Sequence, residues 1–187
     1  MINSLKIFVS TIICLLIFAN SAVAESSHSH AFREHMWQHD EGKMPGLRGE
    51  NAAVEESSDL EVLFRNFETI TREVVNLPNG IKSVTRSSDP EVMEVLVRHS
   101  IGMIQRVEQK DDPKIEIQSP TLNAFFMHGE QIESAMDVTD EGLVIIQTSK
   151  NPVLVKALHV HAAEVSAMAD RGMDAVHEMM MKRMKGH

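Results

Sequence analysis

Residues 70–90 read ITREVVNLPNGIKSVTRSSDP, and residues 132–152 read IESAMDVTDEGLVIIQTSKNP. Each stretch holds two runs rich in β-branched residues, and a turn that contains Gly80 or Gly142 separates the runs. Short runs of this kind on both sides of a glycine-containing turn are typical of a β-hairpin. The sequence therefore predicts two hairpins, one in each half of the chain.

Helices are expected on both sides of each hairpin. Asp89-Pro90 and Asn151-Pro152 each place a capping side chain before a proline, and this combination favours the first turn of a helix. Ser58-Asp59-Leu60-Glu61 has the spacing of a capping box. Ser119-Pro120 marks the corresponding helix start before the second hairpin.

The two halves match at a constant offset of 62 residues, the difference between Gly142 and Gly80. No gap is needed over about 45 positions, which indicates an internal repeat. The matching pairs are Phe64 and Phe126, Glu68 and Glu130, Ile70 and Ile132, Ser87 and Ser149, Pro90 and Pro152, Leu96 and Leu158, and His99 and His161.

An α+β domain follows from this arrangement. One hairpin alone is marginally stable, whereas two hairpins side by side make a four-stranded antiparallel sheet with one face for helices to cover. We expect two tandem helix–hairpin–helix repeats, residues 58–110 and 119–172, related by a pseudo-two-fold axis and followed by a Met- and His-rich helix over residues 173–187. An alternative stays open, in which two ββα units touch only through their helices.

The N-terminal residues have the pattern of a secretory signal. Lys6 precedes an apolar run over residues 7–19, and small residues stand before a cleavage site after Ala24. The run of about 13 residues is shorter than the roughly 20 of a membrane-spanning helix. We therefore expect residues 1–24 to be removed, the protein to be periplasmic or secreted, and no stable membrane insertion afterwards. A retained anchor is the alternative.

The rest of the composition narrows the possible partners. The single cysteine, Cys14, lies in the signal, so no disulfide is expected in the mature chain. The formal net charge of -9 disfavours binding to nucleic acid and favours cations or basic proteins. Residues 25–57 show no sustained apolar period, and we expect a His-rich mobile arm there.

His99 and His161 are the first candidate ligands, because they match in the repeat and lie on the apolar stripes of their helices. An imidazole in an apolar stripe needs a partner for its nitrogens. A pseudo-two-fold axis would bring the rings together, and a shared metal ion or a haem iron would then suit the pair. The alternative is that each ring donates a hydrogen bond to a strand carbonyl.

Other histidines are weaker candidates. His128 is either a third ligand or a surface residue at a helix end. His35 and His39 lie four residues apart in the arm, where imidazole with nearby thioethers suits copper, although a solvated linker explains them too. His177 lies in a helical stripe with Met173, Met180 and Met184, which is more typical of core packing or a partner face than of a metal site.

Two residues close to His161 on the predicted helix after residue 152 also have expected roles. Glu164 lies one turn from His161 and is either an acceptor that orients the ring or an ordinary surface residue. His159 is two residues from His161, which is a rotation of about 200° on a helix. We therefore expect His159 to be exposed.

The chain lacks the common catalytic motifs. It has no CxxCH, no HExxH, no nucleophile elbow and no glycine-rich phosphate loop. The stretches LPNGIKSVTRSSDPEV, IQSPTL and HAAEVSAMADRGMDAVH resemble a family of exported bacterial proteins with tandem S-x-D/N-P repeats. The resemblance covers most of residues 58–181, implies the tandem layout and export, and implies no activity.

The functional expectation is a periplasmic protein that binds copper or haem through histidines repeated in both halves. The alternative is a non-catalytic protein-interaction module of the cell envelope. An enzyme that uses a histidine-bound metal is the third and least supported interpretation, because no base or nucleophile is identifiable by spacing.

Overall fold

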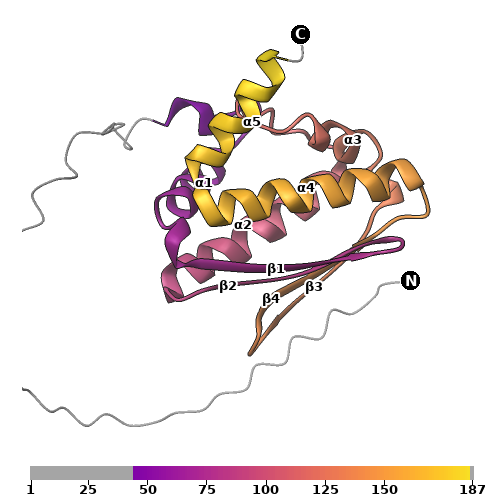
Figure 1. Ribbon diagram of the computed structural model, residues 1–187, viewed down its shortest axis with the longest axis horizontal. Coiled ribbons are helices and arrows are strands. Elements are labelled where there is room, and N and C mark those ends of the chain that lie inside the picture. The colour runs from indigo at the N-terminus through magenta and orange to yellow at the C-terminus, as the bar shows by residue number, and fades with distance from the viewer. Residues whose placement is uncertain (1–43, 186–187) are drawn as a thin grey trace, which may run out of the picture. The chain divides into compact units, whose positions relative to one another are not determined.

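The computed structural model describes residues 44–185, which form an α+β unit with five α-helices and a four-stranded antiparallel sheet (Figure 1). The predicted signal peptide, His35, His39 and residues 186–187 lie outside the described residues. In chain order the elements are η2 (Pro45–Leu47), α1 (Val54–Arg65), η3 (Phe67–Thr69), β1 (Ile70–Leu77), β2 (Gly80–Ser87), α2 (Pro90–Gln109), α3 (Thr121–Met127), η4 (Gly129–Gln131), β3 (Glu133–Thr139), β4 (Gly142–Thr148), α4 (Pro152–Arg171) and α5 (Met173–Lys185).

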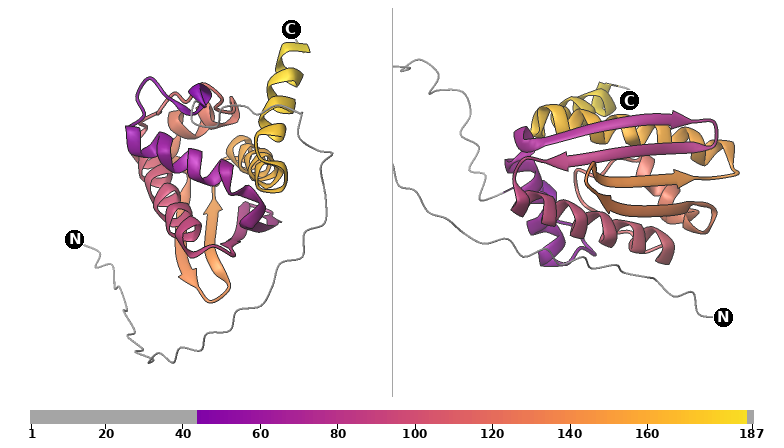
Figure 2. Two further views of the ribbon diagram at one scale, coloured as in Figure 1. Left: turned by 90° about the vertical axis from the view of Figure 1, so that its left-hand side faces the viewer. Right: turned by 90° about the horizontal axis from the view of Figure 1, so that it is seen from below.

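The strands follow the order β1-β2-β4-β3, and all neighbouring pairs are antiparallel. The four-stranded antiparallel sheet predicted from the sequence is therefore confirmed. The two hairpins meet through β2 and β4, with Ser83 opposite Ile145, so the alternative of two units that touch only through helices is wrong. Figure 2 shows the strands as one layer with the helices on one side of it.

The hairpins form where they were predicted, but the turn residues differ. Leu77 pairs with Gly80, so Pro78 and Asn79 make the first turn and Gly80 is the first residue of β2. A Cβ atom at Gly80 would stand 1.9 Å from the carbonyl oxygen of Gln147. This glycine is therefore required by the close approach of β4 rather than by the turn.

Both long helices begin as the capping pattern predicts. The Asp89 carboxylate accepts hydrogen bonds from the backbone N–H groups of Glu91 (2.8 Å) and Val92 (3.4 Å). Asn151 accepts one from the N–H of Val153 at 3.0 Å. These side chains satisfy N–H groups that have no partner within the helix.

The predicted boundary of the N-terminal arm at residue 57 is wrong, because residues 44–57 pack against the domain. Leu47 is only 2% exposed, and Gly49 forms a β-bridge with Ile115. Helix α1 begins at Val54, four residues before the predicted start. Backbone hydrogen bonds, such as the one from the Glu116 N–H to the carbonyl oxygen of Arg48 (3.1 Å), hold this segment. Because these bonds do not involve side chains, they produce no periodic pattern of apolar residues in the sequence.

Helix α4 lies at the centre of the unit. It contacts β1 and β2 on one side, and it also contacts α3 and α5 (Figure 1). The core contains side chains from both halves of the chain: Ile81, Val107, Phe125, Phe126, Ile132, Leu154, Leu158 and Ala162. Among the described residues, no helix combines the length and the apolar character that crossing a bilayer requires.

Two glycines give a matched test of this packing. A Cβ atom at Gly129 would stand 1.8 Å from the carbonyl oxygen of Val107, whereas one at Gly102 would meet nothing within 4 Å. We expect Gly129→Ala to lower the free energy of unfolding by about 1–3 kcal/mol. Gly102→Ala, inside α2, should raise it by about 0.5–1 kcal/mol. Urea denaturation of both variants checks this, and equal effects would contradict the packing of α2 on η4.

Candidate functional site

The prediction that His159 is exposed is wrong, because its ring holds the first hairpin turn. Its Nε2 atom lies 3.1 Å from the carbonyl oxygen of Leu77 and 2.8 Å from that of Gly80. Both partners are acceptors, so Nε2 carries the proton and donates to them. The bond to a strand carbonyl that the sequence suggested for its neighbour, His161, belongs to His159 instead.

His99 faces acidic side chains of α1. Burial lowers the pKa of His99, and the nearby carboxylates of Asp59 and Glu56 oppose this shift without cancelling it. Both carboxylates already bind arginines of α2. Asp59, which is 7% exposed, accepts two hydrogen bonds from Arg98, and Glu56 accepts two from Arg106. His99 therefore lies near two carboxylates that are each already paired with an arginine.

His161 has a different environment, formed by α3 and α4. Its side chain is 26% exposed, and its ring meets that of Phe125 edge-on at a centroid distance of 5.4 Å. Its Nδ1 atom is buried without a hydrogen bond and lies 3.8 Å from Oε2 of Glu164, which is also buried and unpartnered. The sequence-based interpretation of Glu164 as the residue behind this ring agrees with that geometry.

The other oxygen of Glu164 is held in place. The Ser119 hydroxyl donates to Oε1 at 2.8 Å, and the Thr121 hydroxyl lies 3.5 Å from the same atom. Burial raises the pKa of Glu164, but attraction to His161, the hydrogen bond from Ser119 and the charge of Arg183 outweigh it, so the pKa is lowered. The carboxylate is therefore ionised behind the imidazole near neutral pH.

His99 and His128 do not join this cluster by any contact found among residues 44–185. The carboxylates that act on His99 belong to α1, whereas His161 lies near Phe125 and Glu164. His128 and His177 are exposed. Within the described range, no group of three or more His, Cys, Asp or Glu side chains stands close enough to hold a metal ion.

The Met- and His-rich stripe of the C-terminal helix is found on α5, but most of it does not face the core. Met180 is 38% exposed and Met184 is 73% exposed, and His177 is exposed as well. Only Met173 is partly buried. The packed side of α5 instead carries Ala175 and Val176. Core packing is therefore the wrong interpretation of this stripe.

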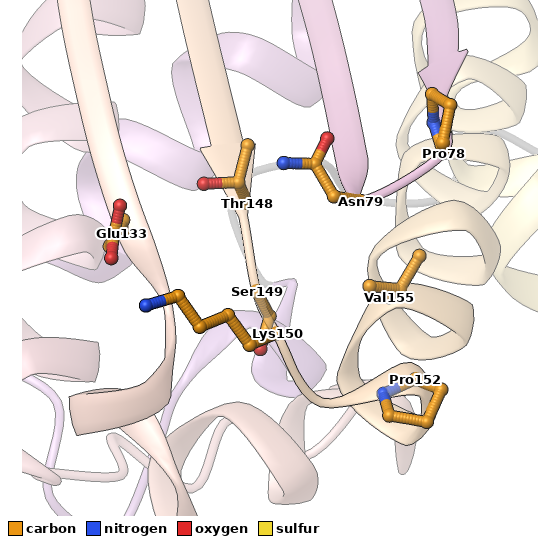
Figure 3. A pocket seen from close by; sticks show the side chains of 8 residues that line it. All are labelled: Pro78, Asn79, Glu133, Thr148, Ser149, Lys150, Pro152 and Val155. Atoms are coloured by element: carbon orange, nitrogen blue, oxygen red, sulfur yellow. The ribbon is translucent and has the colours of Figure 1, made fainter.

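A surface pocket of about 450 Å³ lies at the turn end of β1 and β2, near the start of α4 (Figure 3). Its lining residues are Pro78, Asn79, Glu133, Thr148, Ser149, Lys150, Pro152 and Val155. The pocket contains none of the histidines singled out from the sequence. It is therefore separate from the His161 cluster.

Sequence reasoning missed a half-buried cation, Arg72, on the helix-covered face of the sheet. Arg72 donates from Nη1 to the Thr85 hydroxyl at 2.7 Å, while its Nε has no hydrogen-bond partner. Burial lowers the pKa of Arg72 to about 10. No ion pair found among residues 44–185 includes Arg72. The only sign of it in the sequence was an arginine within the β-branched pattern of the Ile70–Leu77 strand.

Comparisons with family models, with curated proteins and with solved structures found no match to this chain.

The role of His159 predicts a loss of stability when its ring is removed. In His159→Ala the carbonyl oxygens of Leu77 and Gly80 lose their shared donor, and we expect the free energy of unfolding to fall by about 1–3 kcal/mol. His128→Ala, an exposed control, should change it by less than about 0.5 kcal/mol. Thermal and urea unfolding followed by circular dichroism measure both. A loss in the control as large as in His159→Ala would contradict this assignment.

The lowered pKa of His99 predicts a pH dependence of stability. The folded state favours the neutral ring, so the stabilisation is complete above the ordinary pKa of 6.5 and is lost as the unfolded chain takes up protons below it. We expect the free energy of unfolding to fall between about pH 7.5 and 5.5, and to fall less in His99→Gln. Urea titrations across this range test it, with His128→Gln as control. A slope unchanged in His99→Gln would show that other groups cause it.

Proposed function

We propose that the protein binds a transition-metal centre, a copper ion or a haem iron, through Nε2 of His161. The observation that carries the proposal is the Ser119–Glu164–His161 arrangement, in which an ionised carboxylate stands behind one ring nitrogen while the other nitrogen stays open. Histidines that bind metals generally present one nitrogen to the metal and the other to a carboxylate or carbonyl.

The two nitrogens of His161 have distinct surroundings. Nδ1 is sealed from solvent and faces Glu164, whereas Nε2 forms no hydrogen bond within the described residues and is not among the solvent-sealed atoms. A proton on Nδ1 therefore points toward the carboxylate, and the lone pair of Nε2 is left for a ligand. The edge contact with Phe125 restricts rotation of the ring.

The 3.8 Å gap between Nδ1 and Oε2 is longer than a hydrogen bond. Coordination of a cation by Nε2 makes the N–H on the far side of the ring more acidic, and this strengthens its attraction to the carboxylate. We expect the gap to close when the metal centre binds. Glu164 would thus increase the affinity without contacting the metal.

Other histidines of the described chain fit the role less well. Nε2 of His159 is already satisfied by two carbonyl groups, and the acidic neighbours of His99 are committed to arginines. Around His161, residues 44–185 bring together no group of three or more His, Cys, Asp or Glu side chains that could hold a metal ion. A haem would need only one imidazole from the protein, which His161 could supply, whereas a copper ion would take further ligands from solvent.

The proposal also retains the repeat and the export expected from the sequence. The bounds of α2 and α4 differ by 62 residues, as do those of η3 and η4, and the central pair of the sheet joins Ser83 to Ile145 with the same difference. These coincidences support a duplicated unit with a pseudo-two-fold axis beside β2 and β4. Export to the periplasm or beyond rests on residues 1–24, and an envelope partner stays a second possibility.

Titration of the purified protein with haem and with Cu(II) tests the metal proposal. We expect a Soret shift with haem or a nitrogen-coupled electron paramagnetic resonance signal with Cu(II), and we expect His161→Ala to abolish it. Glu164→Gln should weaken the affinity by about 10–100-fold, because the carboxylate behind the ring is lost. The two titrations distinguish haem from a copper ion.

His128→Ala is the matched control for these titrations, since it removes an exposed imidazole from another helix. It should leave both titrations unchanged. Absence of binding by the wild-type protein, or equal affinity in wild type and His161→Ala, would overturn the proposal. A response of His128→Ala equal to that of His161→Ala would mean that binding to surface histidines is non-specific.

A further inference from the structure

Helix α5 has a packed side and an exposed side with different chemistry. Ala175 and Val176 are buried, and Arg183 donates from Nη2 to the carbonyl oxygen of Gln118 at 3.0 Å. Farther round the helix, Met180, Met181 and Met184 are 38%, 50% and 73% exposed. Every large hydrophobic residue found exposed on α5 is therefore a methionine.

His177 lies on the same side as these methionines. At about 100° per residue, residues 177, 180, 181 and 184 fall within an arc of about 100° on the helix surface. Neighbours in this set are three or four residues apart, so their side chains meet across successive turns. One imidazole and three thioethers thus occupy two turns of one helix face, which we call the Met/His face.

We propose that the Met/His face binds Cu(I). Thioether sulfur is an uncharged, soft ligand that suits Cu(I), and imidazole nitrogen completes a mixed sulfur and nitrogen set. Long, flexible methionine side chains on adjacent turns can converge on one ion without any change in the backbone. The inference goes beyond the proposed function, because it uses none of the residues of the His161 cluster.

The charged residues around the face favour a soft ion over a hard one. The acidic residues of α5 are Asp174 and Glu178, and Glu178 is paired with Arg171. Lys182 and Lys185 flank the methionines. Hard cations such as Mg²⁺ or Ca²⁺ require carboxylate or carbonyl oxygen and are repelled by the lysines, whereas covalent bonding to sulfur lets Cu(I) bind.

An apolar protein partner is the competing explanation for exposed methionines, and it makes a different demand on the side chains. A hydrophobic partner accepts leucine in place of methionine, because the two have similar volume and apolar surface. Cu(I) does not, because leucine has no donor atom. Replacing Met by Leu therefore separates the two explanations while leaving the apolar surface in place.

The test is an anaerobic competition titration of Cu(I) against bicinchoninate with the full-length protein. We expect the triple variant Met180→Leu, Met181→Leu and Met184→Leu to bind Cu(I) at least about tenfold more weakly than wild type. X-ray absorption of the Cu(I)-loaded wild type should show sulfur neighbours that the variant lacks. Met127→Leu, a 65% exposed methionine on α3, is the matched control and should behave as wild type.

His161→Ala should retain sulfur-bound Cu(I), so failure of this proposal and failure of the His161 proposal are distinguishable. Equal Cu(I) affinity in wild type and in the triple variant would overturn the inference, as would a wild-type Cu(I) complex without sulfur neighbours. Retention of a protein partner by the leucine variant, with no Cu(I) bound by wild type, would assign the face to docking instead.

Discussion

The pairing of β2 with β4 is the contact on which the rest of the structure depends. Each hairpin alone is a two-stranded ribbon with too little buried surface to persist in water. Their union, which brings Gly80 against the backbone of Gln147, creates one face broad enough for the helices. That face fixes α4 across β1 and β2, and the fixed helix in turn presents His161 to α3.

Helix α4 shows why a single rule about helix faces failed. His159 and His161 point in nearly opposite directions. If one face of a helix is buried and the opposite face is exposed to solvent, one of these rings should be buried and the other exposed. Helix α4 is covered on both sides, by the sheet and by α3 and α5, so both rings are partly buried. One ring holds a strand turn through two carbonyls, and the other meets a carboxylate across a gap.

The features that could be predicted are those encoded within a few neighbouring residues. The hairpins, the Asp89 and Asn151 caps and the sheet follow from local patterns of apolar, turn and capping residues. The bidentate pair of Arg98 with Asp59 spans 39 positions, and the Ser119 bond to Glu164 spans 45. No local pattern specifies which of many polar side chains will meet at such separations. The sequence could therefore place Glu164 one helical turn from His161, but it could not place Ser119 beside Glu164.

Buried polar atoms without hydrogen-bond partners occur on the covered face of the sheet and on α4 near α3. The two sites differ in a way that bears on function. Nε of Arg72 and the Ser83 hydroxyl are unsatisfied on the covered face of the sheet, and Nδ1 of His161 and Oε2 of Glu164 are unsatisfied near α3. Such atoms weaken a core and are expected where function requires them. Only the site near α3 also has a second ring nitrogen, Nε2 of His161, that forms no hydrogen bond within the described residues and is not sealed from solvent. The His161 cluster therefore offers a ligand an unbonded ring nitrogen, whereas the unpartnered atoms on the covered face of the sheet, Nε of Arg72 and the Ser83 hydroxyl, are sealed from solvent.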